Sequence, residues 1–128
     1  MSFFRRSHLF LAFAFAVTAA AAPLPELFNE RLKSVVAVEF FIQAETERQP
    51  VTVLGTVIDD AGTVILPGAA IMPSVAPAQL RDFKIYRPGG SESSVAVYLG
   101  QDAFTGWHFV RIEEKGRAGL VPVPHWRA

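Results

Sequence analysis

The sequence predicts an all-β fold, a small antiparallel barrel or sandwich of about six strands. Segments rich in β-branched and aromatic residues follow one another from residue 34 onward, at the spacing of consecutive hairpins. Turn residues separate these segments, most clearly Asp-Asp-Ala-Gly at 59–62 and Pro-Gly-Gly at 88–90. Only one short stretch, before residue 34, has the apolar spacing of a helix.

The first 22 residues have the pattern of a secretory signal peptide. Arg5 and Arg6 form the positive region, residues 9–17 are apolar, and residues 19–22 are alanines that suit cleavage. The apolar run is about half of the roughly 20 residues that a membrane-spanning helix needs, which favours cleavage over the alternative of a retained anchor. We therefore expect a secreted or periplasmic protein with no membrane association after signal cleavage.

Charge and cysteine content limit the partners of the mature domain. The chain has 12 basic and 12 acidic residues and no cysteine, and signal cleavage removes two of the arginines. The resulting slightly acidic domain gives no reason to expect nucleic acid or anionic lipid as a partner. Without disulfides, an exported domain of roughly a hundred residues must depend on its hydrophobic core.

The elements are predicted in order along the mature chain. Residues 23–33 form a short helical lead-in, because Pro25 suits a first helical turn and the apolar residues after it share one face. Alternating or continuous apolar runs then predict strands at 34–43, 51–58, 63–66, 81–87, 93–99, 107–112 and 120–123. They build one β-barrel domain over 34–124, and residues 125–128 are a tail.

Loops join these strands. Residues 45–50 are predicted as a charged loop, and 59–62 as a tight turn with Gly62 where a positive φ is needed. The longest loop is predicted at 67–78, which holds three prolines and four alanines. Residues 113–119 are predicted as a polar turn.

Three segments, in this order, resemble the amino-terminal barrel of trypsin-like serine proteases of the Deg/HtrA type. The first is the helix that leads into Ser-Val-Val-Ala-Val at 34–38. The second, at 54–66, has a glycine, an apolar strand, an acidic turn ending in glycine, and a strand. The third, at 97–112, has an apolar strand, Gly-x-Asp, a threonine, and a strand ending in Arg-Ile. The resemblance spans about residues 27–123. It implies a six-stranded antiparallel barrel that is related to the barrel of exported proteases.

The same resemblance implies that the catalytic residues are absent. Ala70 occupies the position of the family's histidine, and Gly106 occupies the position of its aspartate, whereas Asp102 matches an earlier, turn-forming aspartate. A methyl group cannot accept the nucleophile's proton, and a glycine has no side chain to orient a base. The family's serine lies in a second barrel, beyond this chain. We therefore expect no catalytic residue.

The residues themselves leave one alternative to the loss of catalysis, an active site that has moved elsewhere in the barrel. His108 would be its base, with a serine as nucleophile, the candidates being Ser74, Ser93 and Ser94. The simpler prediction is a partly exposed strand histidine that shares a face with Val110. His125 lies too near the end of the chain to be held firmly.

No metal or cofactor site is predicted. Two histidines after residue 22 and no cysteine, with scattered carboxylates, do not suit a closed zinc site. The acidic turn at 59–62 lacks the further ligands of a calcium loop. The Gly-Gly-Ser at 89–91 is followed by neither a lysine nor a helix, so it does not match a phosphate-binding loop.

We expect an inactive protease-like module with a binding or scaffolding role. A lone first barrel exposes the wall that a second barrel covers in the family, and the candidate surface comprises the loop at 67–77 with Trp107, His108, Phe109 and Trp126. The expected partner is another protein or a second barrel-like chain. The alternatives are half of a protease cleft completed by another chain, or a truncated fragment of a Deg/HtrA-type serine endopeptidase.

Overall fold

The computed structural model describes residues 23–124. The predicted signal peptide, His125 and Trp126 lie outside the described residues. The chain divides into two units, Met1–Arg31 and Leu32–Ala128. Helix α2 (Pro23–Leu32) belongs almost entirely to the first unit, and the whole β-structure belongs to the second. Glu26 lies in the first turn of α2 and Arg31 in its last, where each charge is favoured by the helix dipole.

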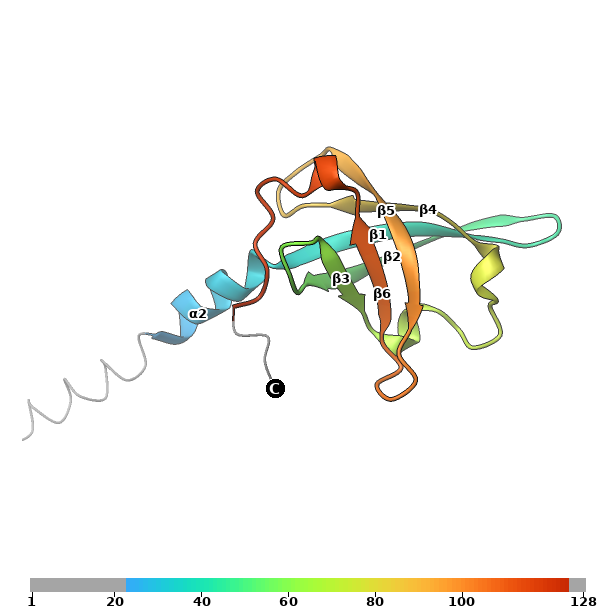
Figure 1. Cartoon of the computed structure of the whole chain (residues 1–128), viewed down its shortest axis with the longest axis horizontal. Coiled ribbons are helices and arrows are strands. Elements are labelled where there is room, and N and C mark those ends of the chain that lie inside the picture. The colour runs from blue at the N-terminus through green and yellow to red at the C-terminus, as the bar shows by residue number, and fades with distance from the viewer. Residues whose placement is uncertain (1–22, 125–128) are drawn as a thin grey trace, which may run out of the picture. The chain divides into compact units, whose positions relative to one another are not determined.

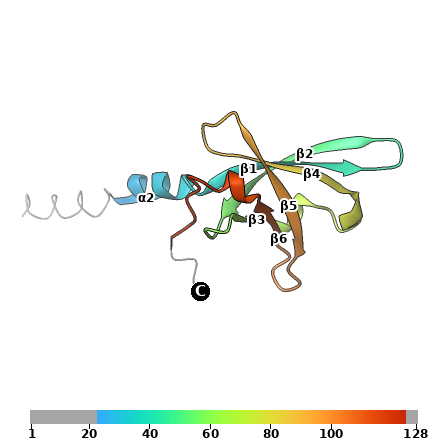
Figure 2. The same cartoon turned by 45° about the horizontal axis from the view of Figure 1, so that its top comes forward.

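The second unit is a closed barrel of six antiparallel strands, as predicted. Its strands are β1 (Val35–Gln43), β2 (Arg48–Val57), β3 (Thr63–Leu66), β4 (Leu80–Tyr86), β5 (Ser93–Gln101) and β6 (His108–Ile112). Around the barrel the order is β1-β2-β3-β6-β5-β4, with β4 returning to β1 (Figure 1, Figure 2). Closure gives every strand two neighbours along at least part of its length.

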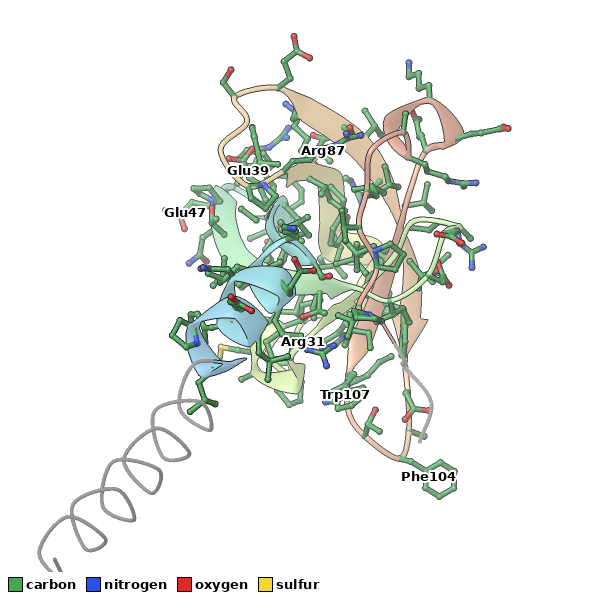
Figure 3. All side chains as sticks on the ribbon, turned by 90° about the vertical axis from the view of Figure 1, so that its left-hand side faces the viewer. Arg31, Glu39, Glu47, Arg87, Phe104 and Trp107 are labelled. Atoms are coloured by element: carbon green, nitrogen blue, oxygen red, sulfur yellow. The ribbon has the colours of Figure 1, made fainter. Side chains whose placement is uncertain are left out.

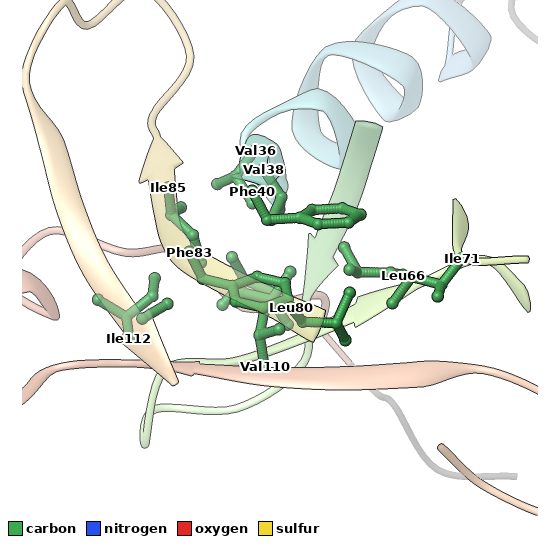
Figure 4. Packing of buried hydrophobic residues seen from close by; sticks show 13 residues of the cluster. Val36, Val38, Phe40, Leu66, Ile71, Leu80, Phe83, Ile85, Val110 and Ile112 are labelled. Carbon is green, nitrogen blue, oxygen red and sulfur yellow. The ribbon is translucent and has the colours of Figure 1, made fainter. Parts of the chain in front are cut away.

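The core consists of the inward-facing residues of all six strands. Along β1 the residues Val36, Val38 and Phe40 are buried and alternate with half-buried neighbours, the period of two that a pleated strand requires. Leu66 on β3 and Val110 on β6 are fully buried (Figure 4). Each such side chain contributes about 1.5–3 kcal/mol on leaving water.

Four aromatic rings form a row across the interior. The ring of Phe40 stacks on Phe83 with a centroid separation of 4.9 Å, and Phe83 stacks on Tyr98 at 5.6 Å. Tyr98 in turn lies 6.0 Å from the tilted ring of His108. The row therefore links β1, β4, β5 and β6, and it leads from the apolar core to two polar rings.

The hairpin of β1 and β2 is longer than predicted. Strand β2 begins at Arg48, so the prediction of a loop over 45–50 is wrong, and the connection is closed by a hydrogen bond from the Ala44 N–H to the Glu47 carbonyl (2.8 Å). Pro50 fits within β2 because β2 pairs with β3 only at Thr56 and Val57. Its missing N–H therefore removes no bond on that open edge.

Strand β4 bends at Asp82. This residue has a φ of 55°, and it is the one non-glycine residue with positive φ in the described range. The pairing of β4 with β1 shifts register at the same place, between Glu39 and Phe41. Arg48 lies at the bend, where its guanidinium forms an ion pair with Asp82 and lies 4.0 Å from the Phe41 ring centroid. The bend turns the first half of β4 away from β5.

The end of the chain differs from the sequence-based prediction. No strand forms over 120–123 in the described residues, and the segment is joined to the barrel by a hydrogen bond from the Val123 N–H to the Val57 carbonyl (2.9 Å). Pro122 and Pro124 flank this bond and have no N–H, so a ladder cannot continue. Strand β6 likewise begins at His108 rather than Trp107.

The turn between β2 and β3 forms as predicted. Gly62 has a φ of 78°, and the Asp59 carboxylate accepts a hydrogen bond from the Thr63 N–H at 3.0 Å. Partial burial acts to raise the pKa of Asp59, but the hydrogen bonds, first that of the Thr63 N–H, outweigh it and leave the pKa lowered.

We predict that Gly55→Ala destabilises the barrel by about 1–3 kcal/mol, the usual effect of overpacking. A Cβ at Gly55 would lie 2.6 Å from Val64 Cγ1 and 3.0 Å from Leu66 Cδ2, both in the core. The matched control is Gly90→Ala, where the nearest atom is 3.5 Å away. Urea unfolding of the two variants checks this, and equal midpoints would contradict it.

We predict that Asp59→Asn flattens the acid side of the stability profile. Because the folded-state pKa of Asp59 is lowered, its contribution is present above the ordinary value of about 4 and disappears as the pH falls through the folded-state pKa. The free energy of unfolding should fall less steeply between about pH 5 and 2 in this variant than in the parent. Urea unfolding across this pH range measures the slope, and an unchanged slope in Asp59→Asn would contradict the prediction.

Candidate functional site

The two positions where the resemblance implies catalytic residues lie on segments that contact each other. Ala70 ends a short 3-10 turn, Gly68–Ala70, after β3, and it is half-buried. Gly106 lies in the loop between β5 and β6. The space for a Cβ on Gly68 lies only 2.9 Å from the Gly106 carbonyl oxygen. The turn and the loop thus pack together, and neither Ala70 nor Gly106 brings an ionisable group to the contact.

The loop that carries Gly106 is ordered by Asp102. Its carboxylate accepts hydrogen bonds from the Thr105 hydroxyl and N–H, both at 2.7 Å, and these bonds lower the pKa of Asp102. The Gly106 N–H donates to the Asp102 carbonyl at 2.9 Å. Asp102 is therefore a turn residue, as predicted. Phe104 at the tip of this loop is 99% exposed and points away from the barrel (Figure 3).

His108 is buried, which corrects the prediction of a partly exposed side chain. Only 3% of it is accessible, and it faces the interior with Val110, as the strand alternation predicted. Its Nδ1 lies 2.8 Å from the Tyr98 hydroxyl and its Nε2 lies 3.3 Å from the Gly68 carbonyl. Because both ring nitrogens have partners, the ring can be buried without an unsatisfied polar atom.

These contacts determine the direction of both hydrogen bonds in the neutral ring. The Gly68 carbonyl can only accept, so Nε2 carries the proton and Nδ1 accepts from the Tyr98 hydroxyl. Burial raises the pKa of Tyr98, which keeps this hydroxyl protonated and able to donate. The hydrogen bonds of His108 thus go to Tyr98 and Gly68, and not to any of the three candidate serines.

The surface predicted around β6 is not continuous. Trp107, with 36% of its surface exposed, and the half-buried Phe109 alternate with His108 and so face the opposite side of the strand. His108 therefore does not belong to an exposed surface with them. The outer face instead continues onto β5 through Val97, which is 57% exposed and pairs with Arg111.

A groove of about 560 Å³ lies beside the Tyr98–His108 pair. One wall is the loop that follows the 3-10 turn, and the opposite wall is the end of β5. The lining residues are Ile71, Met72, Pro73, Val75, Pro77, Leu80, Tyr98, Leu99, Gly100, Gln101 and His108. Sequence reasoning found the loop but not Tyr98 or Leu80. The available signal in the sequence was Tyr98 itself, the one aromatic residue of β5, at an inward-facing position.

Other features of the described residues offer less chemistry. A cavity of about 230 Å³ includes Lys33 and Arg87, but the Arg87 guanidinium already donates to the Gly116 carbonyl. Within residues 23–124 there is no cluster of three or more His, Cys, Asp or Glu residues that could hold a metal. In the same range no helix has the length and apolarity needed to cross a membrane.

Comparison with protein-family models gives no match for this chain. Comparison with curated proteins also gives no significant match.

We predict that Tyr98→Phe destabilises the domain by about 1–3 kcal/mol, because it leaves the Nδ1 atom of the buried His108 without a donor. The control is Tyr86→Phe, the other tyrosine, which should change stability by less than about 0.5 kcal/mol. Urea unfolding measures both. Imidazole nitrogen NMR should show the Nε2-protonated form in the parent, and the Nδ1-protonated form there would contradict the assignment.

Proposed function

We propose that this chain is an exported, catalytically inactive module of the trypsin-like protease type, with a binding or scaffolding role. The closed six-stranded antiparallel barrel, the turn between β2 and β3, and the contact between the Gly68–Ala70 turn and the β5–β6 loop support this proposal. The signal-peptide pattern supports export.

One observation carries the inactive assignment. The two packed segments that would hold a base and its orienting carboxylate carry Ala70 and Gly106. The imidazole that contacts the Gly68–Ala70 turn, His108, is buried and bonded to Tyr98 and a carbonyl. A general base must reach the proton that it abstracts, so this ring is unsuited to activate a serine at the surface.

Exposed apolar side chains support a binding role. On β5, Val95, Val97 and Leu99 are each about half exposed, and Phe104 is almost fully exposed on the loop that follows. Scattered apolar residues are normal on surfaces, but a row along one strand beside an apolar groove is typical of a contact surface.

We predict that a fluorophosphonate probe does not label this chain. The mature protein is treated with the probe alone and in an extract of its source cells, with trypsin as the positive control and heat-denatured chain as the negative control. Circular dichroism establishes that the tested sample is folded. A labelled serine on this chain, in either setting, would overturn the inactive assignment.

A further inference from the structure

We propose that the groove beside β5 binds an extended, uncharged segment of another polypeptide, which adds to β5 as a new strand. This inference rests on the proposed binding role and names its site and the chemistry of its partner. The proposed site is distinct from the outer face of β5 and β6, because the groove lies at the edge of β5.

The first step is that half of β5 has an open edge. Strand β5 pairs with β4 at Ser93, Ser94 and Val95, whereas its pairing with β6 continues to Gln101. Beyond Val95, the bend at Asp82 directs β4 along β1 instead, and Figure 1 shows the two strands diverging. Residues 96–101 thus have no paired residue on β4, over about 20 Å of strand.

The second step is that this edge lacks the proline and the charged residues that commonly block pairing. Proteins usually block open edges with proline, charge or cover. The open edge of β2 follows that rule, since it contains Arg48 and Pro50. Strand β5 (Ser-Ser-Val-Ala-Val-Tyr-Leu-Gly-Gln) has neither a proline nor a charged residue. An exposed edge without proline or charge can accept an added strand.

The third step is the shape of the strand at the groove. A bulge places Leu99 between the pairs Tyr98–Val110 and Gly100–Phe109, so Leu99 has no opposite residue on β6. Gly100 allows this, because its φ of 134° is strained for other residues although no atom lies within 4 Å of its Cβ position. The bulge brings Leu99 into the lining of the groove.

The fourth step is the chemistry of the groove. Its volume of about 560 Å³ lies within the ordinary range of binding sites. None of its lining side chains is a lysine, arginine, aspartate or glutamate. The Tyr98 hydroxyl bonds to His108 Nδ1, His108 Nε2 lies against the Gly68 carbonyl, and the Gln101 side-chain amide donates to the Gly106 carbonyl. A charged side chain would lose its hydration here without gaining a partner. The occupant is therefore uncharged where it lies in the groove.

The walls favour a single strand over a second copy of this barrel. A strand added to β5 lies about 4.8 Å from it. On its other side it meets the groove wall formed by Met72, Val75 and Leu80. Two barrels that pair edge to edge need an edge whose far side is open, because each strand brings its own neighbours. A second copy is thus one outcome of the test rather than the proposed occupant.

The test uses defined peptide probes and the mature chain. The probes are fluorescent, end-blocked hexapeptides built from Val, Leu, Ile, Phe, Thr and Ser, and the tightest member is carried forward by fluorescence anisotropy. Two N-methylated forms of it are then made, one at each set of alternate residues. Alternate N–H groups of a strand point to opposite edges, so one form should lose at least about tenfold in affinity and the other less than about threefold.

Protein variants locate the site. Met72→Glu places a charge in the groove and should weaken binding of the peptide by at least about tenfold. Leu54→Glu is the matched control, because Leu54 is as exposed as Met72, each at 67%, but does not line the groove. It should bind the peptide within about threefold of the parent. Urea unfolding confirms that both variants are folded.

Each result decides the proposal. One-sided sensitivity to N-methylation together with loss in Met72→Glu alone supports it. No binding by any peptide at millimolar concentration, equal loss from both methylated forms, or equal loss in both variants overturns it. A concentration-dependent dimer in ultracentrifugation, with no peptide binding, also overturns it and assigns the edge to a second copy. Fluorophosphonate labelling is independent of the groove, so failure of the inactive assignment is recognised separately.

Discussion

The row of rings from Phe40 through Phe83 and Tyr98 to His108 is the interaction on which the rest of the structure depends. The four rings come from four strands, so their stacking holds together parts of the chain that lie as much as 68 positions apart. The row ends at the hydrogen bond between Tyr98 and His108, which allows a polar ring to be buried under the Gly68–Ala70 turn. The same row of rings therefore packs in the core and, through Tyr98 and His108, lines the groove.

The bend in β4 at Asp82 is the second constraint. It divides β4 into a part that pairs with β5 and closes the barrel and a part that leaves the edge of β5 open. On one side of the bend β4 joins β5 to β1 and closes the barrel, and on the other it follows β1 alone. A backbone with positive φ is sparsely populated for a non-glycine residue, although aspartate tolerates it better than most. The Arg48 guanidinium forms an ion pair with the Asp82 carboxylate at this bend.

Under our proposal, these two constraints explain how the barrel can serve in binding. Our proposal assigns no chemistry to Ala70 and Gly106, and it assigns the partner to a groove that those two residues do not line. His108 then has a structural role, since its imidazole ties β6 to β5 and to the turn after β3. Under this proposal, loss of catalysis and gain of binding concern different parts of the same barrel.

The sequence by itself determined the fold class, the strand at 63–66 and the turn closed by Gly62, because alternation and turn chemistry are local properties. Through the resemblance it also predicted that Ala70 and Gly106 stand at positions where the family has catalytic groups. The tertiary structure alone decided that β2 reaches Arg48, that 120–123 is not a strand, and that His108 is buried. It alone joined Leu80 and Tyr98 in one groove. These features depend on contacts between residues distant along the chain, which periodicity and spacing cannot report.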